Sequence, residues 1–394
     1  MKWNPPKTIT GSPAEGEVYL RRQYINDEFW RRIKNGEHIL ISAPRRVGKS
    51  SIMKDLENNC LDGHICIYNN IESDKTQNDF FKRLLLLLLE KVGTQRKIRK
   101  IISLWLKSKS IGEISIEGNI KFTSKELNYK EELLNIIKLL GQESIHVVML
   151  LDEFPEVIQN IKKNENKNAA IDTLHTLRSI RHDNNFKNFS FAFAGSIGLN
   201  HVVAELDRPR LINDLVPIYV DPLVISEAHK LTKQLVKGAT MKIGDNERDY
   251  LFKKIDYLLP YFIQLMIEKC DFILHKDGRP KLMNIDIDNA FLMVVKEGRN
   301  FNDWESRLKN YYNSSDAKYC IAVLTCCAHF ESYTIQQAYD LIKKIKPITG
   351  YKELIDEVLI RDGYIIEKNG HYNFLSPFLK DWWKNRHPIF EIED

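Results

Sequence analysis

The sequence predicts an α/β fold in which an N-terminal parallel sheet of five strands is followed by helical units. Two observations predict it. Up to about residue 223, short apolar runs alternate with longer amphipathic segments, which is the pattern of a parallel sheet covered by helices. The runs are apolar on both faces, as strands buried between two helical layers are. With 394 residues the chain is long enough for two or three domains, so further units are expected behind the sheet.

Five apolar runs rich in Ile, Val, Leu or Phe are predicted as strands: His38–Ala43, Ile65–Ile71, Val147–Asp152, Phe189–Gly195 and Pro217–Leu223. The connection between the second and third runs is unusually long, and we interpret its residues 94–125 as an insertion. Within it, apolar and polar residues alternate from Ile111 to Phe122, which predicts a small hairpin.

Two further units are predicted from the helical pattern that follows. Residues 224–313 carry three amphipathic segments and predict a helical lid domain: Ser226–Lys237, Glu247–Tyr257 and Tyr261–His275. Residues 314–394 give three helices, then two strands joined by an Asn-Gly turn: Ala317–Phe330, Thr334–Ile345, Tyr351–Asp362 and the strands within Tyr364–Phe374. Because this is the element order of a winged helix, we expect a core over 1–223, a lid over 224–313 and a winged helix over 314–394.

Composition narrows the class of protein. With 43% hydrophobic and 28% charged residues, the chain has the material for packed cores. The longest leucine run, Leu84 to Leu89, is far shorter than the roughly 20 apolar residues of a membrane-spanning helix, and no apolar stretch follows Lys2. We therefore expect a cytoplasmic protein without a membrane partner. The six cysteines form no CxxC pair, so we interpret them as reduced packing residues.

The segment after the first predicted strand has the spacing of a phosphate-binding loop. It matches GxxxxGK[ST] except that Ala43 replaces the first glycine, and a helical pattern follows, as the motif requires. In such a loop backbone N–H groups wrap phosphate at a helix N-terminus. We predict that Gly48 lets the backbone approach, that Lys49 reaches the terminal phosphates and that Ser50 is a magnesium ligand. The predicted nucleotide-binding set is Pro44, Arg45, Arg46, Val47, Gly48, Lys49, Ser50 and Ser51.

A carboxylate is expected at the end of a neighbouring buried strand in such a site, because it holds the magnesium ion. The run from Val147 to Asp152, followed by Glu153, supplies it. We predict that Asp152 holds the metal through water and that Glu153 is the general base for the attacking water. The alternative is that both acids merely cap a junction between strand and helix.

Three more residues are candidates for the site. Ser196 follows the fourth predicted strand, where nucleotide triphosphatases of the additional-strand class carry a polar sensor of the terminal phosphate; helix capping is the alternative role. Arg208 and Arg210 precede the fifth strand. In oligomeric members of that class an arginine at this place enters a neighbour's active site, and a solvated surface pair is the alternative.

Taken together, these pieces resemble the AAA-like archaeal-type ATPases and their relatives among the signal-transduction (STAND) NTPases, a clade close to the origin-recognition initiators. The resemblance spans nearly the whole chain and rests on the loop at 44–50, Leu-Leu-Asp-Glu-Phe at 150–154, Ala-Gly-Ser at 194–196, Asp-Pro-Leu at 221–223 and the winged-helix order. It implies a RecA-like P-loop NTPase core of the additional-strand class, ATP with Mg²⁺, and conformational switching between nucleotide states. Of the family's Gly-x-Pro lid motif only Pro260 is present.

The expected function is that of a Mg²⁺-dependent ATPase, which converts ATP and water to ADP and phosphate and works as a nucleotide-controlled switch. Two alternatives stay open. One is a slowly hydrolysing, ATP-bound adaptor for a partner protein, and the other is a DNA-remodelling or transposition-helper ATPase. The pair Asp152 and Glu153 favours turnover over the adaptor.

A protein partner or self-assembly is expected besides ATP and ADP, and DNA is possible. From Ser314 to Pro388 ten Lys and Arg residues stand against nine Asp and Glu, whereas strong phosphate binding needs a clustered positive face. The sequence therefore leaves open whether the predicted winged helix contacts DNA, packs on the ATPase core or holds a partner protein. Residues 96–109 carry six basic residues and no acid, with isoleucines and Trp105 at helical spacing. We interpret this segment as a docked helix, or as a nucleic-acid or protein surface whose DNA-contact candidates are Arg96, Lys97, Arg99 and Lys100.

Overall fold

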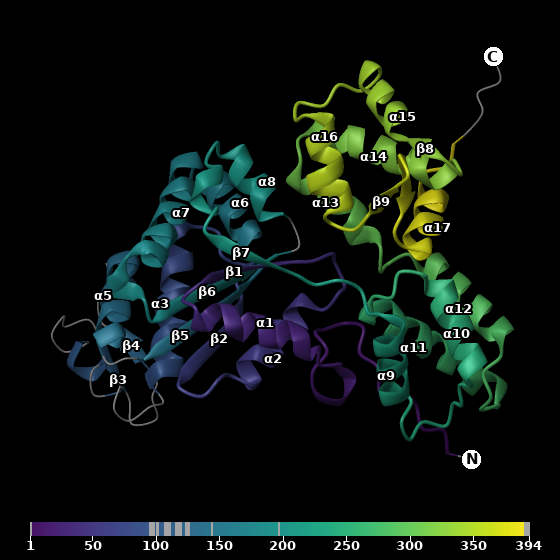
Figure 1. Ribbon diagram of the computed structural model, residues 1–394, viewed down its shortest axis with the longest axis horizontal. Coiled ribbons are helices and arrows are strands. Elements are labelled where there is room, and N and C mark those ends of the chain that lie inside the picture. Colours follow the sequence, from purple (N-terminus) through teal and green to yellow (C-terminus); the bar gives the residue numbers. More distant parts are fainter. Residues whose placement is uncertain are drawn as a thin grey trace. The chain divides into compact units, whose positions relative to one another are not determined.

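The computed structural model describes residues 2–93, 99, 102–105, 112–114, 120–122, 127–142, 145–195 and 198–389 (Figure 1). These residues form two compact units. The sheet unit comprises Arg21–Ser42 and Ile52–Tyr219. The C-terminal unit comprises the described residues of Met1–Leu20, Ala43–Ser51 and Val220–Asp394.

A five-stranded parallel sheet is the centre of the sheet unit, which confirms the predicted fold class. Its strands are β1 (His38–Ser42), β2 (His64–Asn70), β5 (His146–Asp152), β6 (Phe189–Ala194) and β7 (Leu215–Tyr219), in the order β2-β5-β6-β1-β7. Every residue of β6 is buried because helices cover both faces of the inner strands. Pro217 lies in β7, an edge strand, where its missing N–H is tolerated.

The helices of the sheet unit follow the predicted alternation with strands. They are α1 (Gln23–Lys34), α3 (Gln77–Gly93), α5 (Tyr129–Gln142), α6 (Phe154–Asn164), α7 (Lys167–His182) and α8 (Leu199–Glu205), with short 3-10 helices η2 (Asn184–Phe186) and η3 (Pro209–Leu211). Helix α2 (Lys49–Asn58) begins in the segment 43–51 and continues into the sheet unit. Packing of α1 on β1, α3 on β2, and α6 and α7 on β6 buries the sheet.

The predicted insertion contains the predicted hairpin. Strands β3 (Gly112–Ile114) and β4 (Ile120–Phe122) pair in antiparallel register, with Gly112 opposite Phe122. Ahead of them, Ile102 and Trp105 are buried and Leu104 is exposed, which agrees with a helical segment that docks one apolar face. Arg96, Lys97 and Lys100 lie outside the described residues.

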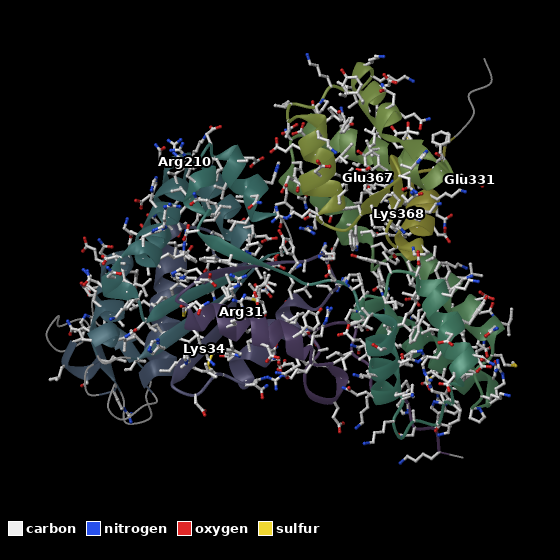
Figure 2. The ribbon with its side chains drawn as sticks, viewed as in Figure 1. Arg31, Lys34, Arg210, Glu331, Glu367 and Lys368 are labelled. Carbon is white, nitrogen blue, oxygen red and sulfur yellow. A yellow bond between two sulfur atoms is a disulfide. The ribbon has the colours of Figure 1, made fainter. Side chains whose placement is uncertain are left out.

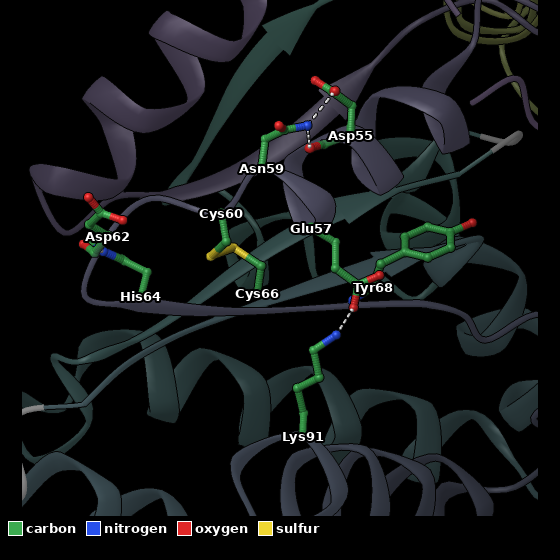
Figure 3. Close-up of a disulfide and its surroundings, with 9 residues drawn as sticks. All are labelled: Asp55, Glu57, Asn59, Cys60, Asp62, His64, Cys66, Tyr68 and Lys91. Atoms are coloured by element: carbon green, nitrogen blue, oxygen red, sulfur yellow. Dashed lines mark hydrogen bonds and ion pairs between the residues drawn. A yellow bond between two sulfur atoms is a disulfide. The ribbon is translucent and has the colours of Figure 1, made fainter. Parts of the chain in front are cut away.

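One pair of cysteines corrects the sequence interpretation. Cys60, which follows α2, and Cys66, in β2, are joined by a disulfide with Cα atoms 5.8 Å apart (Figure 3). The prediction of reduced cysteines is wrong for this pair, because β2 returns beside the end of α2 and brings them together. Close by, Glu57 accepts hydrogen bonds from the Tyr68 N–H at 3.2 Å and from Lys91 Nζ at 2.8 Å. The free cysteines Cys270, Cys320 and Cys327 are buried.

The C-terminal unit begins with five helices: α9 (Ile225–Leu235), α10 (Asp245–Ile255), α11 (Pro260–Asp277), α12 (Asn284–Glu297) and α13 (Asn302–Tyr311). Gly278 ends α11 with a φ of 66°, the left-handed conformation that glycine adopts without strain. Residues 2–20, which include the 3-10 helix η1 (Gly16–Val18), pack on this group. The Lys7 N–H donates to the Leu235 carbonyl at 2.9 Å, and the Ile9 N–H donates to Gln264 Oε1 at 2.8 Å.

The last part of the unit combines helices with a small antiparallel sheet (Figure 1). The helices are α14 (Ser314–His329), α15 (Ile335–Asp340), the 3-10 helix η4 (Leu341–Lys343), α16 (Tyr351–Glu353), the π-helix η5 (Leu354–Ile360) and α17 (Pro377–Arg386). Strands β8 (Tyr333–Thr334), β9 (Ile365–Lys368) and β10 (His371–Phe374) have the order β8-β10-β9. Asn369 and Gly370 link β9 to β10 with φ angles of 54° and 79°, the turn that Asn-Gly predicted.

Aromatic side chains join the two parts of the C-terminal unit in one core. The Phe378 ring of α17 lies 4.5 Å from the Phe291 ring and 5.0 Å from the Phe262 ring, measured between centroids. Burial of these rings fixes α17 against α11 and α12. No helix within the described part of the chain has both the length and the apolar character that crossing a membrane needs.

Candidate functional site

The predicted phosphate loop connects β1 to α2. β1 ends at Ser42 and α2 begins at Lys49. Gly48 has a φ of 101°, a conformation that would be strained in any residue with a side chain. Arg46 also has a positive φ, of 64°. Val47 and Ser51 are buried and anchor the loop. This strand–loop–helix arrangement is the local geometry that the motif needs to present backbone N–H groups to an anion.

The ammonium group of Lys49 is held by the loop itself. Lys49 Nζ donates to the Ala43 carbonyl at 3.0 Å and to the Pro44 carbonyl at 3.3 Å, and the residue is 8% exposed. The loop carbonyls therefore fix a positive charge inside the curve of the segment 43–49. A phosphate oxygen entering that curve would meet a cation that is already positioned.

The two loop arginines are held by residues far along the chain. The Arg46 guanidinium lies over the Tyr261 ring, 4.4 Å from Cζ to the centroid, and Tyr261 donates its hydroxyl to Asn300 Oδ1 at 2.8 Å. Arg45 Nη2 lies 3.7 Å from Asp303 Oδ2 and its Cζ lies 6.0 Å from the Trp304 ring. Cation–π contact and ion pairing thus restrain the side chains of the loop from α11 and α13.

Buried donors of these arginines are left without hydrogen bonds. Among the described residues, Arg45 Nη1 and Arg46 Nε are buried and have no hydrogen-bond partner. Burial lowers the pKa of Arg45, and the charge of Arg307 acts in the same direction. Orphaned guanidinium donors beside a phosphate loop fit an anionic ligand.

The backbone of the loop touches the end of the π-helix. Gly363 follows η5 with a φ of 82°, and a Cβ at this position would lie 2.7 Å from Pro44 Cβ. Only glycine fits both the backbone conformation and the space. The turn at 362–364 therefore lies directly on the loop.

The predicted metal-binding carboxylate ends the buried strand β5. Asp152 is 1% exposed; its Oδ2 accepts the Tyr68 hydroxyl at 3.3 Å, and its Oδ1 accepts the Glu153 N–H at 3.2 Å. Tyr68 lies on β2, the neighbouring strand. The sheet itself therefore fixes the orientation of this carboxylate.

Glu153 occupies an uncommon backbone conformation. Its φ of 60° and ψ of 33° lie in the left-handed region, and it precedes α6 as the N-cap residue without a side-chain cap bond. Residues other than glycine rarely adopt this conformation, and such positions gather at functional sites. The capping role considered from the sequence is therefore not what the Glu153 side chain does.

The strand ends place these parts at one edge of the sheet. β1, β5 and β6 are parallel neighbours, so Ser42, Asp152 and Ala194 all lie at their carboxyl ends. Gly195 follows Ala194, and a Cβ there would lie 2.4 Å from Pro155 Cδ of α6. Ligands of open α/β sheets bind outside this edge. Ser196, the predicted sensor, lies outside the described residues.

Arg208 and Arg210 do not lie at the carboxyl edge of the sheet. Both are exposed and flank Pro209 in η3, ahead of the amino end of β7 (Figure 2). Since β7 runs parallel to β1, they lie toward the edge opposite to the one where β1 and β5 end. The Arg208 guanidinium donates to the Asp207 carbonyl at 2.9 Å. The structure does not bring these arginines to the carboxyl ends of their own strands.

Sequence reasoning missed several residues around the loop. Tyr261, Asp303, Trp304 and Asp362 lie more than two hundred positions beyond the loop and belong to no motif. The one available signal was Pro260, noted for its likeness to a lid motif, which is the residue before Tyr261.

Comparison with solved structures identifies the fold. A Walker-type ATPase of Pyrococcus abyssi is similar over 96% of this chain and 98% of that chain, with a TM-score of 0.62 and 15% sequence identity. The fold is that of a Walker-type ATPase. This confirms the RecA-like P-loop core that the sequence resemblance implied.

Two further solved structures are similar at lower scores. The ORC2 protein of Aeropyrum pernix, in ADPNP and ADP complexes, has a TM-score of 0.48 at 13% identity and covers 95% of this chain and 97% of that chain. The RuvB Holliday junction branch migration motor of Thermotoga maritima has a TM-score of 0.46 at 10% identity and covers 90% and 92%. Likeness at this level supports no statement about function. No family model and no curated protein matches the sequence.

Proposed function

We propose that the protein is a Mg²⁺-dependent ATPase that binds ATP in the loop 43–51. One observation carries the proposal: β1, which leads into a glycine-bent loop with a positioned lysine, and β5, which ends in a buried aspartate, finish at the same edge of the sheet. Phosphoryl transfer needs this pairing of a phosphate cradle with a carboxylate.

The residues take the following roles in the proposal. The backbone of Pro44 to Gly48 and the amides of Ser50 and Ser51 wrap the phosphates, and Lys49 binds their terminal oxygens. Ser50 and Asp152 hold Mg²⁺, and Glu153 accepts the proton of the attacking water. Mg²⁺ when bound supplies charge neutralisation at the terminal phosphates. Ser50 and Asp152 offer hydroxyl and carboxylate oxygens, the donors that Mg²⁺ prefers, and phosphate and water would be its other ligands.

We also infer the arrangement of domains and the role of nucleotide. A core over 1–223, a lid over 224–313 and a winged helix over 314–394 agree with the order of elements, although residues 2–20 pack on α9 and α11. The contacts of Tyr261 and Asp303 with the loop arginines support a conformational switch, since nucleotide in the loop would change what those arginines bind.

Hydrolysis in the full chain tests the proposal. We expect ATP-dependent phosphate release in Mg²⁺ that stops with EDTA. Asp152→Asn should lower the rate at least about a hundredfold because the carboxylate charge is lost while the Tyr68 contact is kept. Glu131→Gln, an exposed acid of α5, is the control. Equal rates in Asp152→Asn and the wild type would contradict the role of Asp152, and absence of Mg²⁺-dependent turnover would favour an adaptor.

We propose that the binding partner is a second copy of this chain. The exposed Arg208 and Arg210, remote from the carboxyl ends of their own strands, suit a site on a neighbouring copy. The rate per protomer should then rise with protein concentration and should fall in Arg208→Ala/Arg210→Ala. Arg31→Ala on α1, another surface arginine (Figure 2), is the control. A rate independent of concentration would reject action in trans.

DNA is the weaker candidate for a partner. The helix 351–360 and the residue after it pair their charges, with Lys352 Nζ 3.0 Å from Asp356 Oδ1 and Arg361 Nη1 2.6 Å from Glu357 Oε2. Glu367 and Lys368, two exposed neighbours in β9, carry opposite charges (Figure 2). Stimulation of the ATPase by duplex DNA that weakens steeply with salt would restore this candidate.

A further inference from the structure

A buried carboxyl group lies in the turn that touches the phosphate loop. Asp362 follows η5 and is 6% exposed. Next along the chain come Gly363 and Tyr364, whose buried hydroxyl donates to the Trp304 carbonyl at 2.7 Å. The turn is thus fastened to α13, and its position does not depend on Asp362 alone.

The same turn is seated on the loop. A Cβ on Gly363 would lie 2.7 Å from Pro44 Cβ, so the Gly363 backbone packs closely against the Pro44 ring. The Pro44 carbonyl oxygen also accepts a hydrogen bond from Lys49 Nζ at 3.3 Å. Asp362 therefore belongs to a turn that lies against the loop proposed to bind phosphate.

The charges around Asp362 belong largely to the loop and to α13. Arg307 Nη2 lies 3.9 Å from Asp362 Oδ2. Burial raises the pKa of the Asp362 carboxyl, while the cations Arg307, Lys49, Arg361 and Arg45 act in the opposite direction. Lys49 and Arg45 thus favour the ionised form of Asp362, and phosphate would draw on the same two cations.

We propose that Asp362 is a specificity-determining residue that competes with the terminal phosphates of a nucleotide for the loop cations and so disfavours a nucleoside triphosphate relative to a diphosphate. The inference rests on the proposed binding of nucleotide in the loop. A triphosphate brings about one more negative charge than a diphosphate to the end of the chain that Lys49 receives. Repulsion between the Asp362 carboxylate and this extra charge is expected to change affinity about tenfold, a modest effect at the effective dielectric constant of about 20 near a protein surface.

Competition works in both directions. If the seated turn weakens triphosphate binding through Asp362, then bound triphosphate in turn disfavours the seated position of the turn 362–364. Since that turn joins η5 to β9, the C-terminal helices and sheet would receive the nucleotide signal through it.

Nucleotide affinities of the full chain test the inference. Asp362→Asn keeps the shape and removes the charge, so we expect ATP to bind about ten times more tightly and ADP to gain clearly less. Asp362→Glu, which keeps the charge, should retain the wild-type preference. Asp356→Asn is the matched control, because this carboxylate of η5 pairs with Lys352 at the surface, and it should leave both dissociation constants unchanged.

A second variant guards against loss of folding. Asp362→Asn leaves Arg307 beside an amide, which costs stability in a buried site, so thermal unfolding is measured with each titration. Gly363→Ala keeps every charge and pushes the turn off Pro44, and it should shift the ATP-to-ADP preference in the same direction.

Two outcomes would overturn the inference. If wild-type binding depends on Lys49 but a folded Asp362→Asn protein keeps the wild-type ATP-to-ADP preference, whether both affinities stay the same or rise equally, this inference alone is rejected. If the wild type binds neither nucleotide, the proposed function fails and this inference falls with it.

Discussion

The two halves of the proposed site are built in different ways. The carboxylate half, Asp152 and Glu153, is fixed within the sheet by the neighbouring strand and by Tyr68. In the loop half, Tyr261 lies under Arg46 and Asp303 lies near Arg45. The backbone at Gly363 packs against Pro44. The carboxylate half is therefore a property of the sheet, and the loop half is also a property of the C-terminal unit.

This difference teaches where regulation can act. A carboxylate positioned by parallel strands changes only if the sheet distorts, which a close-packed core resists. A loop that shares contacts with helices more than two hundred residues away can respond to whatever those helices bind. The loop is the half through which the C-terminal unit can influence catalysis.

The largest effect is expected from the loop lysine. Lys49→Ala removes the cation that the loop carbonyls position, and we expect nucleotide binding to be lost or weakened at least about a thousandfold. Titration with ATP measures it, with Lys54→Ala on the same helix as control. Undiminished affinity would show that the loop does not bind the phosphates.

A substitution of Glu153, the proposed general base, should affect hydrolysis but not ATP binding. Glu153→Gln keeps the shape and removes the base, so ATP should bind normally while hydrolysis falls about a hundredfold or more. Phosphate release and ATP titration are compared in the same preparation. Wild-type turnover would remove Glu153 from the mechanism and leave its left-handed backbone unexplained.

The sheet has a pH sensitivity of its own. Burial, with the charge of Arg181 acting in the same direction, lowers the pKa of His38 to about 4, and its Nδ1 accepts the Phe191 N–H at 3.1 Å. The unfolded chain, with an ordinary histidine pKa near 6.5, binds the proton first, so the free energy of unfolding should fall by about 2 kcal/mol from pH 7 to pH 5 and stop falling on this account below pH 4.

Substitution isolates the histidine from the carboxylates that titrate nearby. His38→Gln can still accept the Phe191 N–H through its amide oxygen and does not titrate. The difference between its unfolding curve and that of the wild type should therefore vary with pH by the stated amount. A constant difference from pH 7 to pH 5 would show that His38 is not the group responsible.

The smallest effect is expected at the contact between the loop and α11. Tyr261→Leu removes the ring under Arg46, and we expect nucleotide affinity to fall about two- to fivefold, the scale of one exposed cation–π contact. Tyr261→Phe keeps the ring and loses only the bond to Asn300, so it should resemble the wild type. Equal losses in both variants would assign the effect to that hydrogen bond instead.

Much of the fold follows from local pattern. The five strands, the hairpin of the insertion and the turn at Asn369 and Gly370 were predictable because strand burial and turn geometry depend on neighbouring residues. The last strand, β7, begins and ends earlier in the chain than predicted, because Val220 and Leu223 are buried beyond the sheet and do not belong to the strand.

The sequence by itself determined the loop motif, the carboxylates at the end of β5 and the parallel sheet, because spacing along one strand–loop–helix unit fixes them. Only the tertiary structure decided that Cys60 meets Cys66, that residues 2–20 pack on α9 and α11, and that Asp362 and Gly363 lie on the loop. Those contacts join residues distant in the chain, and their energy comes from burial and charge pairing that no local pattern records.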